Sequence, residues 1–305
     1  MAMEGKDKVI LTVIVMLWWS VVNCMTFDST VAQDGSGDYK TITEALNAAP
    51  KMSSKTYFIH VKKGNYNENI TIPNDKPNIA LVGDGMDATV ITASKSSKEY
   101  PTPYTATLEV YGSGFIGISL SIRNTAGAAG GQAVALTIAP FKGECLIFGT
   151  IDFITGSGRA IFQNSRLKAR PPNHGQGVRI LAPGADSITS NPGLVLQNCN
   201  ISTTRNFNKT EVESFLGWPW KNGGKAVIMS SYISDFIDPR GWSENPQVTQ
   251  IYLAEYNNRG PGSDTSKRVQ WSKVIDKTEA SKFTVRNFLQ GDKWIPKSIP
   301  YDLDL

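Results

Sequence analysis

Leu194-Val-Leu-Gln-Asn-Cys199 is one of four short segments that share a pattern of apolar, variable, apolar, polar and small residues. The others are Ser119-Leu-Ser-Ile-Arg-Asn-Thr125, Ala160-Ile-Phe-Gln-Asn-Ser165 and Ala226-Val-Ile-Met-Ser-Ser231. Neighbouring copies lie roughly 20 to 45 residues apart, the spacing of solenoid repeats that carry loop insertions. Strands this short cannot bury a core alone, so the pattern favours successive coils of a right-handed parallel β-helix. A β-sandwich is the alternative, because it also combines short strands with turns.

Short strands and turns also dominate the rest of the chain, which holds 27 glycines and 16 prolines. Apolar side chains at helical spacing within Thr41–Ala49 predict one short amphipathic helix. The further strands that we expect, each bounded by turn residues, are Tyr57–Val61, Ile79–Val82, Val90–Thr92 and Thr105–Val110. No linker or low-complexity tract interrupts this pattern, so residues 25–305 are expected to form one domain.

Residues 1–24 have the organisation of a secretory signal peptide. Lys6 and Lys8 precede an apolar run, Val9–Val22, which is shorter than the ~20 residues that a membrane span needs. An uncleaved signal anchor is the alternative. Cleavage would leave the mature protein outside the cell, and three N-glycosylation sequons agree with secretion. These sequons begin at Asn69, Asn200 and Asn208.

The charge of the chain is small and dispersed. Its formal net charge is +4, and its 40% hydrophobic and 19% charged residues are typical of a globular protein. Lysine and arginine form no tract or stripe, so the sequence gives no support to nucleic-acid binding. A mildly basic secreted protein would instead be attracted to an acidic polysaccharide.

Cys145 and Cys199 are the two cysteines that follow the leader. Their spacing matches neither a zinc site nor a disulfide framework. If Cys145, Ser165 and Cys199 occupy successive coils, the two cysteines lie two strand spacings apart, about 9–10 Å. A disulfide requires Cα atoms within roughly 7 Å of each other. We therefore expect no bond between them in a monomer, which thiol counting under denaturing conditions would check.

Several sequence blocks, in order, resemble plant pectin methylesterases, the enzymes that remove methyl esters from wall pectin. Three of them are Gly131-Gln-Ala-Val-Ala-Leu136, Gly149-Thr-Ile-Asp-Phe-Ile154 and Leu216-Gly-Trp-Pro-Trp220. The remaining blocks are Val31–Gly37, Leu81–Met86, Asn124–Gly127, Gly260–Gly262 and Thr265–Arg268. The resemblance extends from about Asp28 to Trp294. It implies a single right-handed parallel β-helix with a helical or irregular C-terminal cap.

The resemblance also implies an activity. It predicts a carboxylic ester hydrolase that acts on methylesterified homogalacturonan in the plant cell wall, without a metal or organic cofactor. Pectin is the expected partner, proteinaceous pectinesterase inhibitors are candidate partners, and the protein is expected to be a monomer. A pectate lyase or polygalacturonase is less well supported, because the sequence has no acidic cluster suited to calcium and no Asp-Asp block.

Asp152 is the residue on which this activity would depend. Strand alternation would put Thr150, Asp152 and Ile154 on one face, and Ile151 and Phe153 on the other. From this pattern alone, a solvated surface carboxylate is expected. The resemblance instead implies a nucleophile, which attacks the ester carbonyl, releases methanol and leaves an acyl-enzyme for water to resolve.

Three further residues match positions that the family uses. The resemblance implies that Gln132 donates an amide N–H to the developing oxyanion and that Thr107 and Trp220 contact the sugar chain. Without the resemblance, Gln132 would be taken for a turn residue bonded to its own backbone, and Trp220 for a core residue.

The general acid of the family has no counterpart in this chain. In the family, a segment similar to Tyr-Gln-Asp-Thr-Leu follows the first of the three blocks, whereas residues Thr137–Phe148 contain no such segment. Aligning the flanking strands implies a loss of about two dozen residues, about one repeat of a solenoid of this kind. Removing a whole coil can preserve stacking. An exon omitted from the gene prediction would explain the gap equally well.

A second departure is Trp218, which stands where the family has arginine. Arginine can hold a carboxylate by two parallel charge-assisted hydrogen bonds, whereas indole has one N–H and no charge. We therefore expect Trp218 neither to orient Asp152 in that way nor to favour its ionised form. Glu109, on the same strand face as Thr107, could replace the missing acid, and the other candidates are Glu144 and Asp186. A non-catalytic pectin-binding wall protein is the alternative function.

Overall fold

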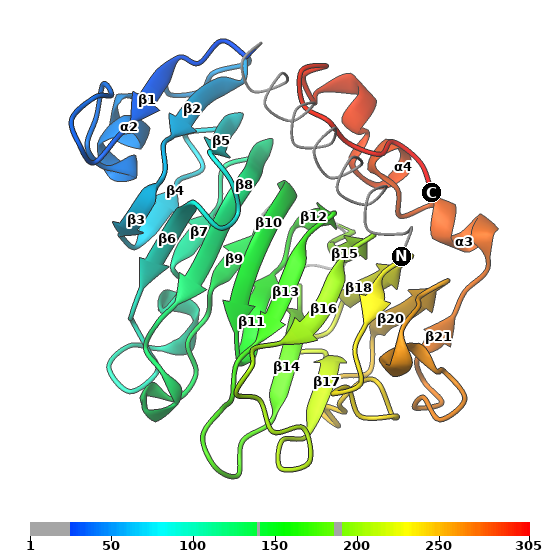
Figure 1. Ribbon diagram of the computed structural model, residues 1–305. Coiled ribbons are helices and arrows are strands. Elements are labelled where there is room, and N and C mark those ends of the chain that lie inside the picture. The colour runs from blue at the N-terminus through cyan, green and yellow to red at the C-terminus, as the bar shows by residue number, and fades with distance from the viewer. Residues whose placement is uncertain (1–24, 139–140, 186–190) are drawn as a thin grey trace, which may run out of the picture.

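The computed structural model describes residues 25–138, 141–185 and 191–305 (Figure 1). The chain winds into a stack of coils, and the strand pairs recorded between coils are all parallel. The fold is therefore the right-handed parallel β-helix that was predicted. The β-sandwich alternative is excluded because that architecture is built from antiparallel pairs.

Two sheets run the length of the stack, and we call them the long sheet and the short sheet. The main path of the long sheet is β1 (Ser29–Val31), β2 (Tyr57–Val61), β5 (Ile79–Gly83), β8 (Phe115–Asn124), β10 (Phe141–Gly149), β12 (Arg159–Gln163), β15 (Gly193–Gln197), β18 (Gly224–Met229), β20 (Ile251–Tyr256) and β21 (Lys273–Val274). Its side branches are β3 (Gly64–Asn67), β6 (Thr89–Ala93), β13 (Arg166–Ala169), β16 (Asn200–Thr203) and β19 (Tyr232–Ile233). The short sheet consists of β4 (Ile70–Ile72), β7 (Leu108–Val110), β9 (Leu136–Ile138), β11 (Ile151–Gly156), β14 (Val178–Pro183) and β17 (Ser214–Gly217).

Three of the four sequence repeats stack in the predicted register. Ala160 pairs with Leu194, and Leu194 pairs with Ala226, in the neighbouring strands β12, β15 and β18. Each of these strands ends at a corner residue with left-handed backbone. The corner residues are Asn164, Asn198 and Ser230, with φ of 54°, 53° and 52°. Asparagine and serine suit such corners, since short polar side chains tolerate this conformation better than bulky ones.

The register predicted for the first repeat is wrong by five residues. Strand β10 pairs on its two sides with Phe115 of β8 and with Ala160 of β12, so Phe115 is the counterpart of Ala160. The corner residue of this coil is therefore Ser119, with φ of 56°, and not Asn124. The error has a physical cause: β8 continues through the corner as one 10-residue strand, so its sequence offers two overlapping matches to the repeat.

The predicted local elements are largely confirmed. Helix α2 (Ile42–Ala48) begins after Thr41, whose hydroxyl accepts from the Glu44 amide in a capping box. Strand β2 has the predicted bounds, whereas β7 begins at Leu108 and not at Thr105. Thr105 instead closes the short helix η1 (Thr102–Tyr104) by donating its amide to the Thr102 carbonyl. The remaining short helices are η2 (Ala128–Gly130), η4 (Pro261–Ser263), α3 (Lys277–Ser281), α4 (Val285–Leu289) and η5 (Gly291–Lys293).

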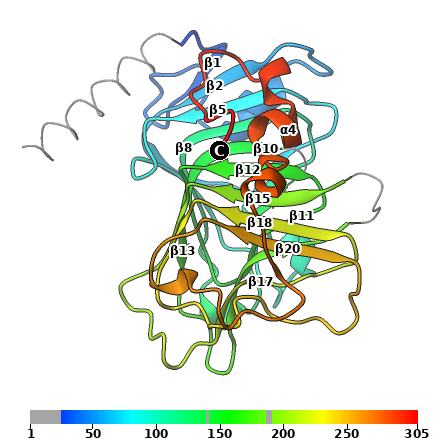
Figure 2. The same ribbon diagram turned by 90° about the vertical axis from the view of Figure 1, so that its right-hand side faces the viewer.

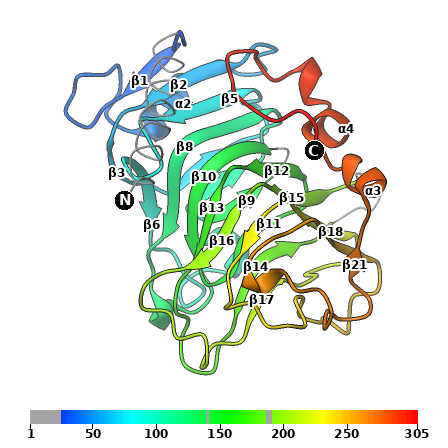
Figure 3. The ribbon, with the colours of Figure 1, turned by 45° about the vertical axis from the view of Figure 1, so that its right-hand side comes forward.

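The C-terminal segment is helical, as predicted, but it packs along the side of the stack and not over its end (Figures 2 and 3). Phe283, Val285 and Phe288 cover the outer face of the long sheet, separate from the core inside the coils. The buried amides of Gln163 and Gln197 donate to the carbonyls of Asp302 and Asp304, at 2.7 and 2.8 Å. The tail thus covers two polar side chains on the outer face of the sheet and supplies the acceptors that their burial requires.

The cysteines occupy the predicted coils. The amide of Cys145 donates to the hydroxyl of Ser165 at 3.0 Å, and Cys199 follows β15, the next strand of the stack after β12. Both thiols are buried. The stacking on which the disulfide argument rests is therefore confirmed, whereas the thiol count remains a prediction.

The predictions on secretion concern the leader and the three sequons. The leader, residues 1–24, lies outside the described residues. Within the part of the chain that the structure describes, no helix is long and apolar enough to cross a membrane. The sequon asparagines Asn69, Asn200 and Asn208 are exposed, as glycan attachment requires, and their occupancy remains a prediction.

A buried ion pair joins the last coils of the stack. The Arg268 guanidinium binds both carboxylate oxygens of Glu255, at 2.7 and 3.0 Å, and the two side chains are only 5% and 2% exposed. The Arg268 guanidinium also donates to the Gly262 carbonyl, which connects two of the sequence blocks singled out above. Trp242 Nε1 donates to the same carboxylate at 3.3 Å.

We predict that Arg268→Met lowers the free energy of unfolding by about 3–5 kcal/mol, because it leaves the Glu255 carboxylate buried without its cation. Chemical denaturation would measure the loss. The exposed neighbour provides the control, since Lys267→Met should change stability by less than about 0.5 kcal/mol. Equal losses in the two variants would contradict the role of the ion pair.

Candidate active site

Asp152 lies at a bulge in β11, so the predicted alternation along this strand is wrong. The pairing of β11 with β14 shifts between Ile151 and Ile154, and Asp152 has φ of 52°. Phe153 and Ile154 both point into the core instead of to opposite faces. This arrangement requires glycine at position 149, because a Cβ there would lie 1.8 Å from Phe153 Cβ. The bulge thus turns the Asp152 carboxylate out of the core and into a pocket on the short sheet.

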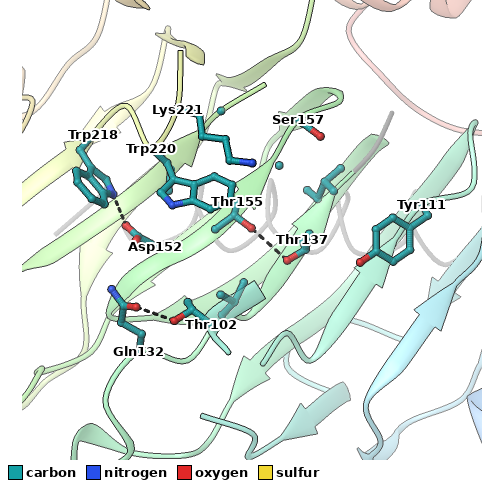
Figure 4. A pocket seen from close by; sticks show the side chains of 15 residues that line it. Thr102, Tyr111, Gln132, Thr137, Asp152, Thr155, Ser157, Trp218, Trp220 and Lys221 are labelled. Carbon is teal, nitrogen blue, oxygen red and sulfur yellow. Dashed lines mark hydrogen bonds between the residues drawn. The ribbon is translucent and has the colours of Figure 1, made fainter. Parts of the chain in front are cut away.

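The pocket has a volume of about 420 Å³ (Figure 4). Asp152 is its single carboxylate among the described residues that line it. The polar and aromatic residues around it are Thr102, Tyr111, Gln132, Thr137, Thr155, Ser157, Trp218, Trp220 and Lys221. Thr137 and Thr155, which are paired in β9 and β11, hydrogen-bond through their hydroxyls at 3.1 Å and form part of its polar floor.

Trp218 orients Asp152 through one neutral hydrogen bond, and not through the two charge-assisted bonds that an arginine could make. Its Nε1 donates to Asp152 Oδ1 at 2.7 Å from the loop that follows β17 (Figure 4). The Trp218 backbone amide in turn donates to the Leu181 carbonyl at 3.0 Å. A single neutral donor at this distance can therefore hold the carboxylate in one orientation, although it supplies no charge.

The carboxylate is only 5% exposed, and this burial raises the pKa of Asp152 from its usual 3.8 to about 6. The hydrogen bond from Trp218 and the positive charge of Arg179 oppose the rise. The prediction that Trp218 would not favour the ionised form of Asp152 is therefore wrong. Asp152 is ionised above about pH 6, which a nucleophilic carboxylate requires.

Arg179 is a residue of the site that sequence reasoning missed. It lies in β14, where it pairs with Ile151 of β11, and so reaches the neighbourhood of Asp152 only through coil stacking. Arg179 lines a second pocket of about 270 Å³, which shares Gln132 and Trp218 with the first. It donates to the Ser243 hydroxyl at 3.1 Å and lies over the Phe215 ring. No motif in the sequence marks this position.

Gln132 and Trp220 are brought to the pocket, as predicted. Gln132 Oε1 accepts from the Thr102 hydroxyl at 2.8 Å, and its amide nitrogen is turned away from Thr102, on the side of Asp152 in Figure 4. The Trp220 ring is 41% exposed and carries the Lys221 ammonium 4.5 Å from its centroid. The alternative of a core tryptophan is excluded by this exposure.

Thr107 is not brought to the pocket. Its side chain is fully buried, and its hydroxyl donates to the Arg123 carbonyl at 3.2 Å. The predicted sugar contact is therefore not available to Thr107, because the residue precedes β7 and turns inward. Tyr111, which is 41% exposed at the other end of that strand, lines the pocket instead.

The candidate replacement acids lie away from Asp152. Glu109 pairs with Thr137, one strand before Thr155, and its carboxylate accepts from Tyr111 at 3.4 Å. Burial raises the pKa of Glu109 above its usual value. Glu144 lies in the long sheet at a register shift, and Asp186 lies outside the described residues. No group of three potential metal ligands occurs among residues 25–138, 141–185 and 191–305.

Fold and site together define a parallel β-helix protein with a carboxylate-centred pocket on its lateral face. The family model described as Pectinesterase matches residues 28–140 and 139–292, and the chain belongs to the pectinesterase family. It is 39% identical to "Probable pectinesterase/pectinesterase inhibitor 42" of Arabidopsis thaliana, covering 90% of this chain and 58% of that protein. It is 38% identical to "Probable pectinesterase 30" of the same plant, covering 93% and 64%. The chain thus spans about three fifths of the length of these relatives.

Solved structures agree with the fold. The pectin methylesterase from carrot superposes with a TM-score of 0.80 at 36% identity, covering 92% of this chain and 99% of that one. The pectin methylesterase PemA from Erwinia chrysanthemi superposes with a TM-score of 0.69 at 24% identity, covering 90% of this chain, and shares the fold.

We predict that Trp218→Phe raises the pKa of Asp152 above about 6, because it removes the N–H donor, and that Trp218→Arg lowers it by adding a cation. Carboxyl-carbon NMR titration would measure both shifts. Trp271→Phe is the matched control, since this indole donates to Glu244 and should leave Asp152 unchanged. A Trp218→Phe titration that coincides with the wild type would contradict the role of the hydrogen bond.

The raised pKa also predicts how stability depends on pH. The folded protein holds the Asp152 proton more tightly than the unfolded chain, so this group stabilises the fold below about pH 4 and loses that contribution as pH rises through about 6. Relative to wild type, Asp152→Asn should therefore gain roughly 2 kcal/mol in free energy of unfolding between pH 4 and pH 7. Denaturant unfolding at several pH values would test this.

The control for this measurement is Asp264→Asn. The Asp264 pKa is lowered by hydrogen bonds from Ser266, so its removal should change the pH dependence in the opposite sense. A constant difference between wild type and Asp152→Asn over this pH range would refute the raised pKa.

Proposed function

We propose that this chain hydrolyses methyl esters of homogalacturonan with Asp152 as the nucleophile. The observation that carries this proposal is the geometry of Asp152, a carboxylate turned into a lateral pocket by a backbone bulge and held by the indole of Trp218. Membership of the pectinesterase family and the carrot pectin methylesterase as a structural neighbour support the substrate class.

In the proposed reaction, a carboxylate oxygen of Asp152 attacks the ester carbonyl carbon. The bond from that carbon to the methoxy oxygen breaks, the methoxy oxygen takes up a proton from solvent water or, through it, from Glu109, and methanol leaves. The acyl group remains on Asp152 as an anhydride, which water hydrolyses to restore the carboxylate and release the free uronic acid. The Gln132 amide nitrogen would stabilise the oxyanion in both steps, because Thr102 already holds its oxygen.

The surfaces around Asp152 suit a sugar chain. Trp220 and Tyr111 are each 41% exposed and line the same pocket. An exposed aromatic face packs against the C–H face of a pyranose, and the threonine hydroxyls between them can bond sugar hydroxyls. These groups would position the sugar chain without requiring a charge on its esterified unit.

Turnover is expected to be slow, because the described residues that line the pocket include no second carboxylic acid to protonate the departing methoxy oxygen. The two ranges of the family match overlap at residues 139–140, within the stretch Thr137–Phe148 that lacks the expected segment. Strands β8 and β10, and β9 and β11, pair directly across this point, which is consistent with the loss of one whole coil. A missing general acid typically costs 10²–10⁴-fold in rate.

Glu109 is the replacement acid that we propose to test. It lies two strand spacings from Thr155, about 9–10 Å, so it could deliver a proton only through Tyr111 or water. Its raised pKa favours the protonated form that a donor needs. We also propose that the protein is secreted to the cell wall, is a monomer and is recognised by proteinaceous pectinesterase inhibitors. These three proposals rest on the family and on the relatives' names.

Methanol release from highly methylated pectin would test the proposed activity. We predict slow release by the wild type and none above background by Asp152→Asn. Asp276→Asn, the same chemical change at a distant helix cap where asparagine serves equally well, should leave the rate unchanged. If Glu109 supplies the proton, Glu109→Gln should also abolish release.

Two outcomes would contradict these assignments. Wild-type release that matches Asp152→Asn, with pectin still retained in a pull-down, would favour a non-catalytic pectin-binding protein. Unchanged release by Glu109→Gln would end the proposed role of Glu109 but not that of Asp152.

A further inference from the structure

Two arginines share one aromatic ring on the outer surface of the long sheet. Strands β8, β10 and β13 lie next to one another (Figure 3). Arg123 of β8 pairs with Phe148 of β10, and Phe148 pairs with Lys168 of β13. The guanidinium carbons of Arg123 and Arg170 lie 4.7 and 4.9 Å from the Phe148 ring centroid. Ile147 and Leu167 alternate with these residues and point into the core, so Phe148 and Lys168 face outward.

Each guanidinium is held in place by a hydrogen bond to strand β8. Arg123 Nε donates to the Ser121 hydroxyl at 2.8 Å. Arg170, which follows β13, donates from Nη1 to the Asn124 carbonyl at 2.7 Å. Each guanidinium has five N–H donors, so both retain donors for a further acceptor. The two guanidiniums are therefore preorganised, and only some of their N–H donors are used within the protein.

No described carboxylate neutralises this pair. Neither Arg123, Lys168 nor Arg170 forms an ion pair within 4.0 Å with any acidic group of the described residues. Asp87, the acid that acts on Arg123, already binds Arg166 at 2.8 Å. Burial lowers the pKa of both arginines, and the charge of Arg123 lowers that of Arg170 further. Like charges that are brought together and partly desolvated attract an anion.

We propose that Arg123, Arg170 and Lys168 form a binding site for the carboxylates of a de-esterified polyuronate, outside the pocket of Asp152. None of the three lines either pocket near Asp152. Guanidinium groups bind carboxylates by two parallel hydrogen bonds, and Lys168 adds a third cation two strand spacings, about 9–10 Å, from Arg123. Phe148 is already engaged by two cations, so it spaces them and is not available to stack a nucleic-acid base.

This site goes beyond the proposed activity. The pocket would take the esterified unit, whereas the arginine pair would take units that already carry a free carboxylate. A polysaccharide that has lost its methyl esters would thus be retained on a second surface of the same molecule. Binding at this surface does not require Asp152, so the two proposals can fail separately.

The test measures the affinity of the full chain for fully de-esterified polygalacturonate. Arg123→Gln and Lys168→Gln should each weaken binding by about 10-fold, with a larger loss at low salt. Lys55→Gln, an equal charge change at an exposed position in another coil, is the matched control. Methanol release from methylated pectin should be unchanged in all three variants, which also reports that they fold.

Three results would overturn the proposal. The first is an affinity for polygalacturonate in Arg123→Gln and Lys168→Gln equal to that of Lys55→Gln. The second is an equal loss of affinity for inorganic polyphosphate, which would mean that the surface recognises charge and not uronates. The third is a loss of affinity for polygalacturonate in Trp220→Ala as large as that in Arg123→Gln, which would mean that the pocket of Asp152, and not a separate surface, binds the de-esterified chain.

Discussion

Parallel stacking of each coil on the next is the constraint on which the rest of this structure depends. A coil that continues the register of its neighbours buries its apolar side chains and satisfies its backbone hydrogen bonds together. Ala160, Leu194 and Ala226 follow one line through three coils, and the corners that follow them repeat the same left-handed conformation. Loops between strands can vary in length without disturbing this register. Strands β8 and β10 accordingly pair directly, although the sequence between them is shorter than in the family.

The site arises from a local violation of that register. At the β11 bulge two successive apolar residues, Phe153 and Ile154, point into the core. The side chain of Asp152, which precedes them, therefore points outward. The neighbouring coils then supply what surrounds Asp152: Trp218 from the loop after β17, Arg179 from β14 and Gln132 from the loop before β9. Where the family has a cation, this chain uses an indole N–H and leaves the carboxylate with a raised pKa.

Local and periodic features could be predicted from the sequence, and features created by stacking could not. Helix α2 and strand β2 depend on neighbouring residues, so their patterns were sufficient. The resemblance to known blocks identified Asp152, Gln132 and Trp220, but the inward turn of Thr107 depends on where β7 begins. Arg179 carries no sequence signal, because its neighbour Ile151 lies one coil away. The bulge at Asp152 likewise depends on how Phe153 packs beneath Gly149.

The tail that runs along the long sheet has a consequence for synthesis and handling of the protein. Gln163 and Gln197 take their carbonyl partners from the final four residues, and Arg286 binds the carboxylate of Asp304. Coils can stack as the chain emerges from the ribosome, but the outer face at Gln163 and Gln197 is completed only after Asp302 and Asp304 have been synthesised. A truncation or fusion that displaces residues 302–305 would therefore uncover both glutamines.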